Sequence, residues 1–380
     1  MPQTMLGSYG AWAASLVGDE PPAFSFRRDG WSDVESWRQV ARQRLLERLA
    51  PPAPGPIPDV TVNSHFTYDD LHVELLSWQP PAGPRAEAIF LKPADAQEPL
   101  PGVLAFHDHG GKKYFGKRKI AQIAHEPHPM MREHHAEFYG GVAWANQLAR
   151  RGYAVLIPDA YAFGSRRVRL ADVPEAIKAG LPAETLETVA AIQAYDQWAA
   201  EHESIMAKSL FCGGTTWPGV FFSEDQRALD ILCRRTDVDA ARIGCGGLSG
   251  GGLRTVLLGG LDSRIQCAVC AGMMTTWRDF LLNTSYTHTW MIYIPLLPPE
   301  LDYPEILGLR VPLPTLVLNN SDDSLFTLAE MERADRILQE LYAKAEAQDH
   351  YQCRFYPGSH KFDSDMQAMA FDWFDHWLKG

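Results

Sequence analysis

The chain has 380 residues, of which 46% are hydrophobic and 22% are charged, and this composition is typical of a folded globular protein. Its 35 Lys and Arg residues against 47 Asp and Glu residues give a formal net charge of −12. The chain is therefore not expected to bind nucleic acid, because contacts to phosphate groups need a basic surface.

The first residues are small and apolar but have no lysine or arginine before them, so they lack the charged start of a secretory signal. The longest apolar stretch, residues 290–297, is too short to cross a bilayer, and no membrane association is expected. The six cysteines do not have the spacing of a disulfide framework, which favours a reducing compartment. We therefore expect a cytoplasmic protein.

Residues 31–50 repeat apolar side chains at helical spacing and predict a helix with Ser32 as its N-cap. The proline-rich residues 51–58 end this helix and form a stiff spacer. We therefore divide the chain into an N-terminal helical extension with a Pro-rich linker, residues 1–59, and a catalytic domain, residues 60–380. The apolar stripe of the helix would pack on its own domain or on a second subunit, so a homo-oligomer is one interpretation.

From residue 60, short apolar segments alternate with amphipathic helical patterns. Strands are predicted over residues 67–78, 86–91, 102–106 and 154–158, and further strand and helix units follow to the end of the chain. This pattern predicts the α/β class, with a mostly parallel sheet of about eight strands and helices on both faces. Two insertions, at about residues 112–140 and 165–220, are expected over the carboxyl edge of the sheet, where sites form.

The strongest chemical signal is the segment 247–251, Gly-Leu-Ser-Gly-Gly, which follows a predicted strand and opens a predicted helix. This is the context of a nucleophile elbow, in which small residues two positions before and after the serine let the backbones pack closely. The helix N-terminus behind the serine favours developing negative charge. We interpret Ser249 as a nucleophile; the alternative is a tight turn between a strand and a helix with no chemical role.

A serine hydroxyl becomes an effective nucleophile when a base takes its proton and an acid orients that base. Both partners follow Ser249 in the expected chain order. Asp323 lies in the loop after the predicted strand 314–320 and is the predicted acid, with Asp322 as the alternative. His360 lies in the loop after the last predicted strand, before the terminal helix, and is the predicted base.

The oxyanion that forms during acyl transfer needs two backbone N–H donors. One donor is expected from Gly250, the residue after the nucleophile. The other is expected from the loop 107–111, with His109 as the predicted donor and Gly110 or Gly111 as alternatives.

With these motifs in place, residues 60–380 resemble the α/β-hydrolase superfamily, and within it the bacterial carboxylesterases related to dienelactone hydrolases and acetyl xylan esterases. The resemblance rests on HDHGG at 107–111, YAVLIPDAYAFGSR at 153–166, VDAARIGCGGLSGGG at 238–252, NNSDDSLF at 319–326 and YPGSHKF at 356–362. It implies a serine esterase with Ser249 as nucleophile, Asp323 as acid and His360 as base. Two departures stand out: dienelactone hydrolases use a cysteine where Ser249 stands, and Asp108 stands where related esterases usually have glycine.

Residues 112–119 carry five cations within eight positions. A run of this kind is usually a solvated face; the functional interpretation is that it lines the mouth of the pocket and attracts a substrate with a carboxylate. Six histidines lie between residues 107 and 135, but their spacing is not that of metal ligands, so no metal site and no cofactor are predicted. Cys267 and Cys270 have CxxC spacing within an apolar run and are predicted to be buried strand residues.

The sequence therefore predicts a serine carboxylester hydrolase that forms an acyl-enzyme on a small-molecule ester, with an acetyl ester as one candidate substrate. The first alternative is an amidase or peptidase with the same triad, because acyl transfer to serine serves both leaving groups. The second is a binding protein that keeps the hydrolase fold without the chemistry.

Overall fold

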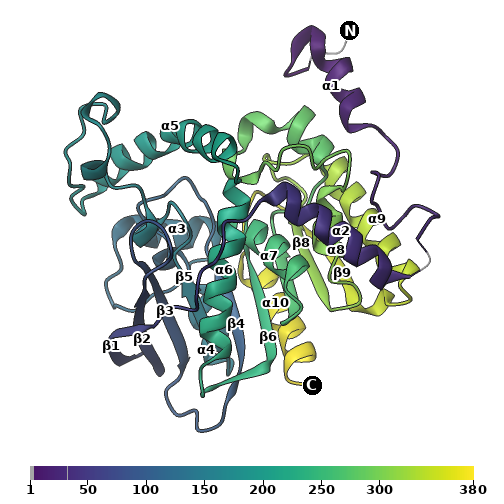
Figure 1. Ribbon diagram of the computed structural model, residues 1–380. Coiled ribbons are helices and arrows are strands. Elements are labelled where there is room, and N and C mark those ends of the chain that lie inside the picture. The colour runs from purple at the N-terminus through teal and green to yellow at the C-terminus, as the bar shows by residue number, and fades with distance from the viewer. Residues whose placement is uncertain (1–3, 32) are drawn as a thin grey trace.

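Nine strands form one sheet in the part of the chain that this computed structural model describes, residues 4–31 and 33–380 (Figure 1). The strands are β1 (Thr61–Tyr68), β2 (Leu71–Trp78), β3 (Ala86–Pro93), β4 (Leu100–Phe106), β5 (Ala154–Pro158), β6 (Val238–Leu248), β7 (Ile265–Ala271), β8 (Thr315–Asn320) and β9 (Tyr351–Tyr356). Their order across the sheet is β1-β2-β3-β5-β4-β6-β7-β8-β9. The pairs from β5 through β4 to β9 are parallel, and β1, β2 and β3 add an antiparallel edge. The predicted α/β class with a mostly parallel sheet is confirmed, with nine strands where about eight were expected.

The additional strand comes from a tight hairpin. The sequence predicts a single strand over residues 67–78, whereas β1 and β2 are two antiparallel strands joined by Asp69 and Asp70. Both aspartates have positive φ, 49° and 64°, which a two-residue hairpin turn requires and which Asp tolerates better than most residues. The side chains of β1 are almost all exposed, so this strand lacks the apolar alternation by which a sequence reveals a strand.

Helices cover both faces of the sheet, as predicted (Figure 1). One face packs in a common apolar core with α2 (Val34–Leu49), α6 (Trp217–Cys233), α7 (Gly250–Leu261), α8 (Tyr303–Gly308) and α9 (Leu328–Lys344). The other face packs against α4 (Trp144–Arg150) and α10 (Ser364–Leu378). Cys267 and Cys270 are fully buried in β7, as the apolar run around them indicated. In the described residues, no helix combines the length and the apolar character that a membrane span requires.

The helix predicted over residues 31–50 is α2, and its apolar side belongs to the same core as the sheet. Ser32, the predicted N-cap, lies outside the described residues, and the Asp33 side chain accepts a hydrogen bond from the Ser36 amide, 2.8 Å away. Trp37 is fully buried, stacks on Phe26 and donates its indole N–H to the Phe24 carbonyl at 2.7 Å. In the fold, therefore, α2 packs as one of the helices of this sheet face.

The segments that interrupt the alternation of strands and helices lie near the carboxyl ends of the parallel strands. The first predicted insertion contains α3 (Pro129–Phe138) and the second contains α5 (Val189–Gly213), while the short helix α1 (Gly10–Val17) projects from the body near the N-terminus (Figure 1). A third irregular segment, residues 272–302 between β7 and α8, was not predicted as an insertion and consists of short helical turns. This third segment supplies one wall of the cavity described below.

Candidate active site

Ser249 lies at the sharp turn between β6 and α7, as the Gly-Leu-Ser-Gly-Gly pattern predicts. Its backbone has φ 57° and ψ −116°, a conformation that L-residues rarely adopt. A Cβ atom added to Gly247 or to Gly251 would lie 2.3 Å from the carbonyl oxygen of Phe106, at the end of the neighbouring strand β4. Only glycine fits at these two positions, so the end of β6 and the start of α7 both pack directly against the end of β4, with the strained serine between them.

Asp323 and His360 meet across the loops that follow β8 and β9. The Asp323 Oδ2 atom lies 2.6 Å from Nδ1 of His360, and Asp323 Oδ1 accepts a hydrogen bond from the Leu325 amide at 3.0 Å. The Asp323 side chain is fully shielded from solvent. The alternative acid, Asp322, points elsewhere, because its Oδ2 accepts a hydrogen bond from the Gly358 amide at 2.7 Å. The geometry thus pairs His360 with the first of the two predicted acids.

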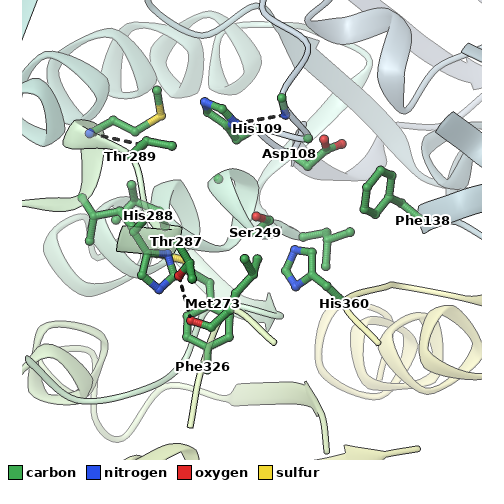
Figure 2. A pocket seen from close by; sticks show the side chains of 18 of the residues that line it. Asp108, His109, Phe138, Ser249, Met273, Thr287, His288, Thr289, Phe326 and His360 are labelled. Carbon is green, nitrogen blue, oxygen red and sulfur yellow. Dashed lines mark hydrogen bonds between the residues drawn. The ribbon is translucent and has the colours of Figure 1, made fainter. Parts of the chain in front are cut away.

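Ser249 and His360 face the same cavity, and Figure 2 shows the serine hydroxyl beside the histidine ring. Nε2 of His360 is buried and has no hydrogen-bond partner among the described residues. Gly272, at the end of β7, has φ +55°, and a Cβ there would lie 2.9 Å from the His360 ring. A glycine at this position therefore leaves room for the ring, with the nitrogen opposite Asp323 directed into the site.

The loop after β4 reaches the elbow through His109. A Cβ atom added to Gly250 would lie 3.0 Å from the backbone nitrogen of His109, so these two backbones are in close contact. The amide of Gly111, one of the alternative donors, already donates to Nδ1 of the His109 ring at 3.1 Å. The backbone nitrogen of His109, the first of the predicted second donors, therefore lies beside Gly250, the other predicted donor.

The carboxylate of Asp108, whose direction the sequence leaves open, is bound by residues around the end of α3. Its Oδ1 atom accepts hydrogen bonds from His134 Nε2 at 3.0 Å and from the Tyr139 hydroxyl at 2.5 Å. Burial opposes ionisation, but His134 and Lys119 hold the pKa of Asp108 well below its usual value. Asp108 therefore stays ionised and anchors the loop to the first insertion.

The His109 ring is held by Glu203 of α5, a residue that no sequence signal indicated. Nε2 of His109 donates to Glu203 Oε1 at 3.1 Å, and Lys113 Nζ lies 2.5 Å from the same oxygen. Burial of Glu203 opposes its ionisation, yet hydrogen bonding to His109 and the charge of Lys113 lower the pKa of Glu203 to about 2. The second insertion thus supports the loop that carries the candidate oxyanion donor.

The basic segment, residues 112–119, is largely neutralised by partners within the protein. Lys113 pairs with Glu203, and Lys117 pairs with Asp159 and Glu87 at 2.7 and 2.9 Å. Arg118 lies 2.6 Å from Glu187, and Lys119 is fully buried. Lys112 lies 5.8 Å from the centroid of the Phe138 ring at the cavity wall. A solvated face therefore does not describe this segment.

The cavity beside Ser249 has a volume of about 430 Å³. Its lining is mostly apolar, with Phe138, Leu253, Met273, Met291 and Phe326 among the wall residues. The irregular segment 272–302 adds Thr287, His288 and Thr289 (Figure 2). Burial lowers the pKa of His288 to about 4, so this imidazole is neutral at physiological pH. Sequence reasoning did not single out residues 287–289, because they match no motif and no helical or strand period.

The histidines of residues 107–135 do not converge on a common point, and those with side-chain hydrogen bonds use separate partners. His107 bonds to the backbone of Asp108 and Ala160, and His134 bonds to the Asp108 carboxylate. Among the described residues, no group of three or more His, Cys, Asp or Glu side chains is arranged to hold a metal ion.

Comparisons with known proteins agree with this architecture. No family model matches the chain. "Putative hydrolase YtaP" of Bacillus subtilis (strain 168) is 27% identical over 270 residues, which are 70% of this chain and 75% of that protein. A solved structure described as a "putative acetyl xylan esterase" from Bacteroides fragilis NCTC 9343 is 16% identical, covers 93% of this chain and 83% of its own, and gives a TM-score of 0.67. A glucuronoyl esterase from Solibacter usitatus is 16% identical, with coverage of 94% and 98% and a TM-score of 0.61.

These structural neighbours establish the fold of the chain. The sheet order, the elbow between β6 and α7, and the structural superpositions all correspond to the α/β-hydrolase fold.

Proposed function

We propose that this chain, which has the α/β-hydrolase fold, is a serine carboxylester hydrolase with Ser249, His360 and Asp323 as its catalytic triad. The main support is the 2.6 Å contact between Asp323 and His360, in the same cavity as the strained serine at the elbow. The structural neighbours named as esterases support an ester as the substrate class.

In the proposed mechanism, the carboxylate of Asp323 accepts the Nδ1–H of His360 and leaves Nε2 free to take the Ser249 proton. The serine oxygen forms a bond to the ester carbonyl carbon, and the negative charge that develops on the carbonyl oxygen is stabilised by the amides of Gly250 and His109. The bond to the alcohol breaks as His360 returns the proton to the leaving oxygen. Water, activated by the same histidine, then hydrolyses the acyl-enzyme and releases the acid.

The cavity supports a neutral rather than an anionic ester. Its wall is mostly apolar, the neutral ring of His288 adds no charge, and most cations of the basic segment are paired with acids of the protein. Acetyl esters fit this proposal, because a short acyl group needs little space next to Ser249. The resemblance to dienelactone hydrolases supports the fold but not their substrate, since Ser249 replaces the cysteine of those enzymes.

We further propose a cytoplasmic location and a function without a cofactor. The six cysteines of the chain are all free thiols in the described residues, and this supports a reducing compartment. A homo-oligomer remains a second proposal, supported by the exposed side chains of Tyr9, Trp12 and Leu16 on and beside α1.

The first experiment compares the wild-type protein with Ser249→Ala on p-nitrophenyl esters from acetate to octanoate. We expect the wild type to hydrolyse at least the short esters and Ser249→Ala to lose roughly 10³-fold or more in kcat. A fluorophosphonate should label the wild type and not the mutant. Retention of esterase activity in a folded Ser249→Ala protein would refute the proposal.

The same assays separate the two alternatives. A wild type that labels with fluorophosphonate but cleaves an anilide faster than the matched ester would be an amidase. A wild type that neither labels nor hydrolyses any ester or anilide would be a binding protein with this fold.

A further inference from the structure

Lys119 is a buried cation that the proposed triad mechanism does not use. Its exposed fraction is 0%, and its Nζ atom donates to the carbonyl oxygens of Asp108 at 2.8 Å and of His109 at 2.7 Å. The ring of Phe163 lies 4.7 Å from the ammonium group. Burial of an ammonium group is strongly unfavourable unless hydrogen bonds and charges compensate it, so a buried lysine at this position calls for a structural or chemical reason.

The position of Lys119 relative to one peptide group supplies that reason. The carbonyl of Asp108 and the N–H of His109 belong to the same planar peptide and point in opposite directions. On the carbonyl side, the oxygen contacts Lys119 Nζ and, at 2.9 Å, His107 Nδ1. On the amide side, the His109 nitrogen lies next to Gly250. A donor that holds the carbonyl therefore also holds the direction of the N–H toward the nucleophile elbow.

The charge of Lys119 has a second effect on this peptide. A cation that donates to a carbonyl oxygen draws electron density from the amide, and the N–H of the same peptide becomes a stronger donor. The neutral His107 ring, whose pKa burial lowers to about 3, holds the same oxygen without adding charge. Of the two side chains that bind the Asp108 carbonyl oxygen, Lys119 is therefore the charged one.

We propose that Lys119 is a positioning residue for the oxyanion hole, which fixes and polarises the Asp108–His109 peptide so that the His109 amide can stabilise the tetrahedral intermediate. The inference rests on the proposed esterase function. Lys119 itself does not touch the substrate, because its ammonium group lies behind the peptide, on the side away from Gly250.

Several charged groups face Lys119 and set its protonation. Asp108 Oδ2 lies 3.9 Å from Nζ, and the charges of Asp196 and Asp159 also favour the protonated form, while Lys112 opposes it. Burial is the larger effect and lowers the pKa of Lys119 to about 8. The ammonium group is therefore charged at pH 7 and loses its proton as the pH rises through 8.

The test compares Lys119→Met with Lys117→Met, a matched control from the same segment. Lys117 Nζ binds the carboxylates of Asp159 and Glu87 and makes no contact to the Asp108 or His109 carbonyl. The assay is hydrolysis of p-nitrophenyl acetate at pH 7. We expect kcat of Lys119→Met to fall roughly tenfold to a hundredfold, because oxyanion donors stabilise the transition state. KM should stay within about threefold of the wild-type value. Lys117→Met should keep kcat within about threefold. An unchanged kcat in a folded Lys119→Met protein, or an equal fall in both variants, would overturn the inference.

The pH profile of the wild type gives a second readout that needs no folded variant. We expect kcat to decrease above about pH 8, and this decrease should be absent from the profile of Lys119→Met where that variant folds. A wild-type kcat that stays constant from about pH 7 to 9.5 would overturn the inference. Both of these results concern Lys119 alone. The esterase proposal fails in a different way: the wild type shows no esterase activity, or Ser249→Ala retains it.

Discussion

Asp322 and Asp323 are neighbours in sequence, but they hold different partners. Asp323 contacts His360 at 2.6 Å, whereas Asp322 accepts a hydrogen bond from the Gly358 amide. We expect Asp323→Asn to lower kcat by about 10³- to 10⁴-fold, because an amide neither fixes the histidine tautomer nor stabilises the imidazolium. Asp322→Asn serves as the control and should stay within about tenfold. The measurement is steady-state hydrolysis of p-nitrophenyl acetate, and a larger loss in Asp322→Asn would reverse the assignment.

Single residues were predictable from the sequence where their role is set by close neighbours in the chain. The elbow is such a case, because its strand, serine turn and helix are continuous in the chain and carry a recognisable pattern, even though the atom that excludes a Cβ at Gly247 and Gly251 is the Phe106 carbonyl oxygen of β4. Glu203 is the opposite case: it lies 94 residues from His109 and inside a long helix, where nothing in the local sequence distinguishes this buried acid from an exposed one. The partners of Asp108 come from 26 and 31 residues away, so its direction required the fold.

At the level of elements, α2 packs into the core that one face of the sheet shares with α6 to α9. Trp37 is 0% exposed in this core, and we expect Trp37→Ala to lower the free energy of unfolding by about 3–5 kcal/mol. Val40, which lies in the same helix and is 39% exposed, is the control, and Val40→Ala should change the free energy of unfolding by about 0.5 kcal/mol or less. Urea unfolding followed by tryptophan fluorescence and circular dichroism measures both. Equal stability of the two variants would mean that α2 contributes little to the main fold.

Helical periodicity predicted α2 within a few residues, because its buried positions repeat along one side. It did not predict β1 as a separate strand, since the exposed side chains of β1 show no alternation. The segment 272–302 was missed for a similar reason: its short turns have no period that a sequence pattern can detect. The elements around the site were thus predicted best where one side is buried, and least where irregular backbone forms the cavity wall.

The charge of the whole molecule makes a further prediction. The net charge is −12, and most cations of the basic segment are paired with acids, so the protein should repel an anionic ester. Salt screens this repulsion: between about 20 and 500 mM NaCl, KM for p-nitrophenyl hemisuccinate should fall, whereas KM for p-nitrophenyl butyrate should change little. A rise of KM for the hemisuccinate with salt would instead indicate that the basic segment attracts anionic substrates.

The parallel strands deliver all the site loops to one edge of the sheet, and this leaves the opposite edge free for engineering. The turn between β3 and β4, residues 94–99, is mostly exposed and precedes β4, whereas the loop 107–111 follows it. The seven residues of β4 separate the two by roughly 20 Å. A reporter peptide or an affinity tag inserted at Asp95–Gln97 would extend into solvent on the far side of the molecule. The protein could then be attached to a solid support through this turn with the mouth of its cavity facing the solution.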